Sequence, residues 1–76
     1  MLPRLKEARS MDVKLFVTIR KLSGSNQYQY AGKLGISRSL VAKIETGERA
    51  ITTDISAKVR EEFGADYIEQ VAKLVK

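Results

Sequence analysis

The stretch from residue 27 to residue 46, QYQYAGKLGISRSLVAKIET, constrains the fold more than any other part of the chain. It predicts two short amphipathic helices joined by a tight turn. Asn26 can cap the first helix, and Gln29 can hydrogen-bond back to the amide of Asn26, as in a capping box. Gly35 can adopt the left-handed conformation that ends a helix, and Ser37 can cap the second helix.

Each of these helices carries one apolar stripe, with its members at positions i, i+1 and i+4. The stripe residues are Tyr30, Ala31 and Leu34, then Leu40, Val41 and Ile44. Because helices this short are marginal alone, both stripes must pack on other elements. The second helix ends at Gly47, and its opposite face, which is polar or small, stays free.

A further helix is predicted on the N-terminal side of this pair. It starts at Ser10 as the cap, has Asp12 in its first turn and runs to about Leu22. One face of it holds Val13, Phe16, Val17 and Arg20. We expect the apolar part of this face to pack on the helix pair.

Two more helices are predicted in the C-terminal part. Either Thr52 or Thr53 caps the first of them, which stops at Gly64. Its apolar stripe holds Ile55, Val59 and Phe63. The last helix, residues 66–76, carries one stripe of Ile68, Val71, Ala72 and Val75 and a second of Tyr67, Val71 and Leu74. The second stripe is surplus to the core and predicts a dimer contact; in the alternative, Tyr67 and Leu74 only cover the edge of the core.

Together these patterns predict an all-α fold, a compact five-helix domain over residues 10–76. Residues 1–9 are either a basic arm or a backward extension of the first helix. A domain of 76 residues buries only ~60% of its unfolded surface, so its spare stability is small.

Composition excludes several function classes. The chain has no cysteine and no histidine, so it offers neither a disulfide nor the commonest metal ligand and general base. We therefore expect no enzyme, no metal and no cofactor. No apolar run is long enough to cross a membrane and no signal-type core is present, so a cytoplasmic location is expected, either in a bacterial cytosol or in a phage-infected host.

The net charge of +5 is unevenly spread. Residues 1–22 hold six basic and two acidic side chains, whereas residues 51–76 hold four basic and five acidic ones. This asymmetry fits a polyanion partner on one side, although ordinary solubilising lysines would give the same balance.

The segment resembles the lambda-repressor/Cro-like helix-turn-helix family, also called XRE-type. The match consists of Gln27, Ala31, the turn Gly35-Ile36-Ser37, Val41, Ile44, Glu45 and Gly47, with Arg20 upstream. It covers roughly Val13 to Ile68. The chain departs from the family pattern at Tyr30, where leucine is preferred, at Gly32 inside a helix, and in lacking the proline common after the second helix.

The resemblance implies roles for particular residues. The second helix would enter the DNA major groove and read bases through Arg38, Ser39, Ala42 and Lys43. Phosphates would be held by Gln27, Ser37, Tyr28, Lys33 and Arg49, and for Tyr28 a surface position without a role is the alternative. Arg20 and Glu45 would form a structural ion pair; in the alternative both are solvated.

These residues predict a sequence-specific regulator of transcription that binds double-stranded DNA. The favoured interpretation is a phage or bacterial repressor that binds a pseudo-palindromic operator as a homodimer, with room for a regulatory protein partner. The alternative is a protein-binding module of the same fold, antitoxin-like, without specific DNA readout. Small Ser39 and Ala42 leave room for this alternative, whereas Arg38 and Lys43 favour DNA.

Overall fold

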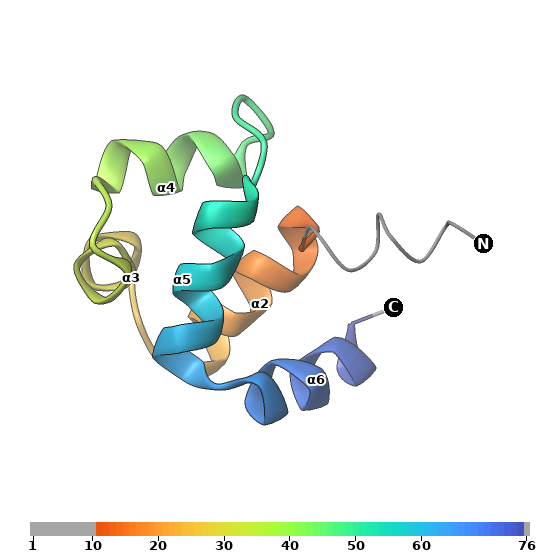
Figure 1. Ribbon diagram of the computed structural model, residues 1–76. Helices are drawn as coiled ribbons and strands as arrows, with labels where there is room; N and C mark the ends of the chain where they lie inside the picture. Colours follow the sequence, from red (N-terminus) through yellow and green to blue (C-terminus); the bar gives the residue numbers. More distant parts are fainter. Residues whose placement is uncertain (1–10, 76) are drawn as a thin grey trace.

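The computed structural model describes residues 11–75, which form five helices around one core (Figure 1). The helices are α2 (Val13–Leu22), α3 (Gln27–Leu34), α4 (Arg38–Glu45), α5 (Thr53–Phe63) and α6 (Ala65–Leu74). The all-α, five-helix prediction is confirmed. The predicted arm of residues 1–9, the cap at Ser10 and the last residue of the predicted 66–76 helix lie outside the described residues.

The caps of the helix pair form as predicted. The side chain of Asn26 accepts from the amide of Gln29 at 2.7 Å, and the amide of Asn26 donates to the side chain of Gln29 at 2.9 Å. Gly35 closes α3 with φ at 70°, in the left-handed region. Ser37 caps α4 by accepting from the amide of Leu40 at 3.0 Å. Three residues of connection therefore turn the chain from one helix into the next.

The start of α2 corrects the sequence analysis. Asp12 does not lie in the first turn but is itself the N-cap, in extended conformation, and accepts from the amide of Leu15 at 2.9 Å. Met11, just before it, is only 7% exposed. Because Met11 joins the core before the helix begins, the cap falls on Asp12 and not on Ser10.

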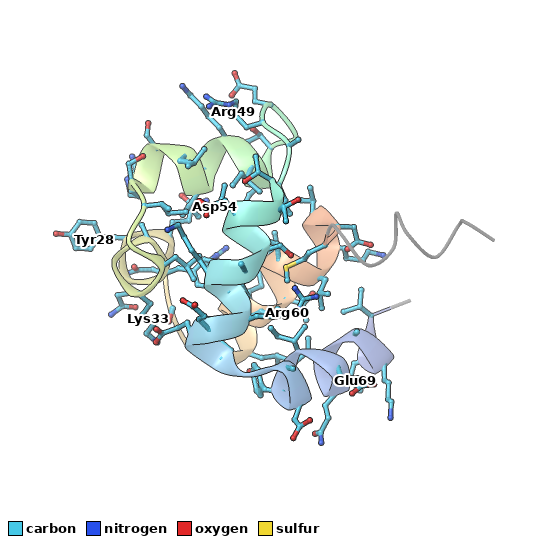
Figure 2. The ribbon with its side chains drawn as sticks, in the orientation of Figure 1. Tyr28, Lys33, Arg49, Asp54, Arg60 and Glu69 are labelled. Carbon is cyan, nitrogen blue, oxygen red and sulfur yellow. The ribbon has the colours of Figure 1, made fainter. Side chains whose placement is uncertain are left out.

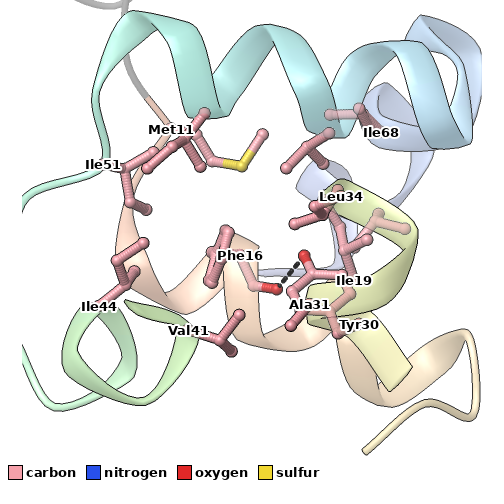
Figure 3. Packing of buried hydrophobic residues seen from close by; sticks show 13 residues of the cluster. Met11, Phe16, Ile19, Tyr30, Ala31, Leu34, Val41, Ile44, Ile51 and Ile68 are labelled. Atoms are coloured by element: carbon pink, nitrogen blue, oxygen red, sulfur yellow. Dashed lines mark hydrogen bonds between the residues drawn. The ribbon is translucent and has the colours of Figure 1, made fainter. Parts of the chain in front are cut away.

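Tyr30 is a fully buried member of the core (Figure 3). Its hydroxyl donates to the carbonyl oxygen of Phe16 at 2.8 Å, and its ring meets the Phe16 ring edge-on, with centroids 5.1 Å apart. Burial, and next the nearby negative charge of Glu45, raise the pKa of Tyr30 well above its ordinary value. A tyrosine thus replaces the leucine that the family prefers because its hydroxyl finds a backbone acceptor on α2.

On two helices the buried face differs in part from the predicted stripe. On α2, Ile19 is fully buried beside Phe16, whereas Val13 and Val17 are half-buried, so the buried face is rotated from the predicted one. On α6, Ala72 of the first predicted stripe is exposed, whereas Val71, which belongs to both predicted stripes, is only 2% exposed and lies in the core. Its side chain is therefore unavailable to a second copy, and the predicted dimer contact loses its central member.

The arrangement of the helices leaves α4 exposed along one side. α4 packs on α3 and α2, and α6 packs on α2 and α5. α5 also packs on α3. Figure 1 shows α6 at the end of the molecule opposite α4. Within the described residues, the outward side of α4 is thus covered by no other helix. Nor is any helix of residues 11–75 long and apolar enough to cross a membrane.

A test of the core concerns Ser56 on α5, which is 1% exposed and whose hydroxyl has no hydrogen-bond partner among residues 11–75. Ser56→Ala removes an unpaired buried hydroxyl, so it should raise the free energy of unfolding by about 1 kcal/mol in urea titrations. Ala57→Ser, at an exposed position of the same helix, measures the difference in helix propensity alone. A gain for Ser56→Ala no larger than this difference would mean that the hydroxyl is paired.

Candidate nucleic-acid interface

α4 separates a buried from an exposed side along its whole length. Val41 and Ile44 are fully buried, and Leu40 is half-buried. On the other side lie the four predicted base readers, of which Arg38, Ser39 and Lys43 are exposed and Ala42 is half-buried. Apolar contacts thus fix the helix from below, while its outward side keeps polar groups available.

The structure brings Arg20 of α2 and Glu45 of α4 together as a two-point ion pair. Arg20 Nε donates to Glu45 Oε2 at 2.7 Å, and Nη2 donates to Oε1 at 3.0 Å. The remaining nitrogen of the fork, Nη1, donates to the carbonyl oxygen of Ser25 at 3.1 Å. The side chains of Arg20 and Glu45 are only 15% and 10% exposed. The pair therefore joins the end of α4 to α2 and to the connection before α3.

Gln27 extends this pair to the reading side of α4. Its Nε2 donates to Glu45 Oε1 at 2.9 Å, and its Oε1 accepts from Arg38 Nη1 at 3.4 Å. Phosphate binding by Gln27, predicted from the free backbone amides at the start of its helix, stays a prediction, whereas its side-chain amide is engaged within the protein. What it offers to a ligand is its backbone amide at the start of α3, where helix geometry supplies no partner.

The surroundings of Glu45 favour its charged form. Burial alone acts to raise the pKa of its carboxyl group, but hydrogen bonds from Arg20 and Gln27, with the positive charges of Arg20 and Lys21, outweigh it. The pKa of Glu45 consequently lies below its ordinary value of 4.5.

The other predicted phosphate ligands do not all lie together. Ser37 is exposed at the start of α4, Tyr28 is 74% exposed and points away from α3, and Arg49 is exposed in the loop after α4 (Figure 2). Lys33 differs: its ammonium group donates to Ser25 Oγ at 3.0 Å and lies 5.9 Å from the centre of the Phe63 ring. Lys33 thus joins α3 to its neighbours on the side of α5.

A groove beside the start of α4 was missed by the sequence analysis. It encloses about 440 Å³ between α3 and the turn. Its lining includes Tyr28, Gln29, Gly32, Ile36, Ser37 and Arg38. The one signal for it in the sequence is Gly32, a glycine inside a helix, which was read only as a weakness of that helix.

The chemistry of this surface is that of a binding site. Among residues 11–75 no group of three Asp, Glu, His or Cys side chains could hold a metal ion. The exposed groups around α4 are instead donors: a guanidinium, an ammonium, hydroxyls and helix amides. Such groups suit phosphates and the acceptor atoms of base edges.

Comparisons with known proteins give one match. The family model described as Helix-turn-helix matches residues 18–74, which is three quarters of the chain. The matched range contains α3, α4, α5 and the whole Arg20–Glu45–Gln27 cluster. No curated protein and no solved structure matches the chain.

The ion pair generates a prediction about acid stability. The pKa of Glu45 in the folded state lies below its ordinary value of 4.5, so the charged carboxylate adds to the free energy of unfolding. This contribution is fully present above about pH 4.5 and is lost as the pH falls through the folded-state pKa. Glu45→Gln should lower the free energy of unfolding by about 2 kcal/mol at neutral pH. In urea titrations at a series of pH values, the gap between this variant and wild type should narrow toward about pH 3.

The matched control is Glu48→Gln, which removes an exposed carboxylate three residues away. It should change stability by less than ~0.5 kcal/mol at every pH. A gap for Glu45→Gln that stays constant down to pH 3 would contradict the coupling of this carboxylate to Arg20.

Proposed function

We propose that this chain, which belongs to the lambda-repressor/Cro-like (XRE-type) helix-turn-helix family, is a repressor of transcription that binds a pseudo-palindromic DNA operator as a homodimer. The family match supports a DNA-binding regulator in general, and the family is typically non-enzymatic. The observation that carries the proposal is the outward side of α4, where Arg38, Ser39 and Lys43 are exposed on a helix held by the half-buried Arg20–Glu45 ion pair.

In this proposal α4 lies in the major groove and its N-terminal residues read base edges. Arg38 donates with both arms of its fork to O6 and N7 of a guanine, the commonest specific contact. Its present bond to Gln27, at 3.4 Å, is long enough to be weak, so the guanidinium is oriented without being sealed off. Ala42 meets a thymine methyl group, and Lys43 reaches a base or a phosphate.

Phosphate contacts set the register of the helix on the duplex. Ser37 and Gln27 each lie at the start of a helix, where free amides and the positive end of the helix dipole favour phosphate. Arg49 lies beyond the end of α4 and meets the same strand further along. These contacts carry affinity but no sequence information.

A dimer follows from the small size of the reader. One helix reads too few base pairs for useful specificity, whereas two readers about one helical turn (~34 Å) apart face the same side of the duplex. Leu74 of α6 is 72% exposed. Tyr67, on the same helix, is half-buried and stacks on Phe63 with ring centroids 5.8 Å apart. Because α6 lies at the opposite end from α4, a contact through Leu74 and Tyr67 leaves both readers uncovered (Figure 1).

The experiment that tests the function is selection from random duplex DNA, followed by binding measurements across salt concentrations. A repressor should enrich a motif with two-fold symmetry and bind it at least ~10³-fold more tightly than random DNA. A protein-binding module of the same fold would enrich no motif, and that result would overturn the proposal.

The roles of the two arginines can be separated. Arg38→Ala should weaken binding to the selected operator by about 1 to 3 kcal/mol and relax one of its positions, because it removes a base contact. Arg49→Ala should weaken all sequences alike, because it removes a phosphate contact. Titrations of both variants on operator and random duplexes measure this; equal losses on both DNAs for Arg38→Ala would refute base reading by Arg38.

The dimer contact is tested with Leu74→Glu, which places a charge on the exposed end of α6. Wild type should sediment as a dimer at tens of micromolar, and its melting temperature should rise with concentration, because folding and association are linked. Leu74→Glu should be a monomer. Leu22→Glu, at another exposed leucine (56% exposed), is the matched control and should stay dimeric. A monomeric wild type that binds its site as one copy per duplex would exclude the dimer.

A further inference from the structure

Gly32 has no structural reason to be glycine. It lies inside α3 with an ordinary helical backbone, and a Cβ atom added there would meet nothing within 4 Å. Four other glycines of the chain have positive φ and need the residue type for that reason. A glycine inside a helix costs about 1 kcal/mol relative to alanine. Something other than the fold therefore accounts for the bare backbone at this position.

The bare backbone opens the groove of about 440 Å³ beside the start of α4. Tyr28, one helical turn before Gly32 and 74% exposed, lines this groove together with Ile36 of the turn. Figure 2 shows the Tyr28 ring projecting outward from α3. A methyl group at residue 32 would project into the open space between these side chains without touching another protein atom.

We propose that this groove holds the sugar-phosphate backbone of one DNA strand, with a deoxyribose packed between the Tyr28 ring and Gly32. This inference rests on the proposed DNA binding and specifies how the strand beside α4 is held. Ser37, at the start of α4, lines one end of the groove, where the helix amides favour a phosphate, and none of the lining residues is acidic. The rest of the lining is mostly apolar, which suits the C–H surface of the sugar between two phosphates.

The contact assigned to Tyr28 is thus made by its ring and not by its hydroxyl. Packing of this kind releases no counterions, because it neutralises no phosphate. It also reads no base, so it adds affinity equally to all sequences. These two properties distinguish it from the phosphate contact of Arg49 and from the base contact of Arg38.

Gly32→Ala in the full chain is the decisive variant, because it should gain stability and lose binding together. Its melting temperature should rise by about 4 to 8 °C, since alanine favours the helix. Its affinity should fall about fivefold or more, by the same factor on the selected operator and on random duplex DNA. Loss of binding in a variant that is more stable than wild type cannot be due to unfolding.

Tyr28 variants test which part of the ring acts. Tyr28→Phe should bind within about twofold of wild type, whereas Tyr28→Ala should lose about tenfold, the value of covering roughly 50 Å² of ring at about 25 cal/mol per Å². Leu22→Ala, which truncates another exposed apolar side chain, is the control and should bind as wild type does. Across salt concentrations, Tyr28→Ala and Gly32→Ala should keep the wild-type slope of log K, whereas Arg49→Ala should reduce it by about 0.9.

Three results would overturn the inference. Gly32→Ala that binds DNA as wild type does would show that the groove is not occupied by the strand. Equal losses for Tyr28→Phe and Tyr28→Ala, or a reduced salt slope for Tyr28→Ala, would assign a phosphate contact to the hydroxyl instead. A wild-type chain that binds no duplex at all would refute the proposed function itself. This outcome is distinct from the three results above, in which wild type still binds DNA.

Discussion

The Arg20–Glu45 ion pair is the interaction on which the geometry of the reading surface depends. Its net effect on stability is small compared with an apolar pair of the same size, because two charges must lose water to form it. Its two directed hydrogen bonds hold one orientation of α4 relative to α2, which an apolar contact without directed bonds would not do. Gln27 links the pair to Arg38, so a half-buried ion pair and an exposed arginine at the start of α4 form one continuous hydrogen-bonded chain.

Local chemistry made most of the fold predictable. The capping box at Asn26, the glycine end of α3 and the serine cap of α4 need only groups within four residues, so the sequence determined their positions closely. The errors lie where a distant part of the chain decides. Met11 enters the core and Asp12 caps α2, which begins at Val13, and the packing of α2 buries Ile19 more deeply than the predicted Val13 and Val17. Periodicity alone cannot choose between two overlapping apolar stripes.

The Arg20–Glu45 ion pair was predictable from the family pattern, but its further connections were not. The hydrogen bonds of Gln27 show that its side chain joins Glu45 to Arg38, a link that the sequence did not indicate. Lys33 was assigned by charge, whereas its position depends on Ser25 and on the Phe63 ring, which come from other parts of the chain. Contacts between segments distant in sequence leave no trace in helical periodicity, so they had to come from the structure.

Tyr30 and Gly32 show how a small domain divides stability from function. Tyr30 departs from the family pattern and strengthens the core, because its hydroxyl reaches a carbonyl that leucine would leave without that donor. Gly32, two residues later on the same helix, departs from the pattern in the opposite direction and weakens α3. The two sides of one short helix thus meet different demands. The inward side joins α2 and α5 through aromatic contacts, and the outward side gives up helix stability where the groove beside α4 needs an uncovered backbone.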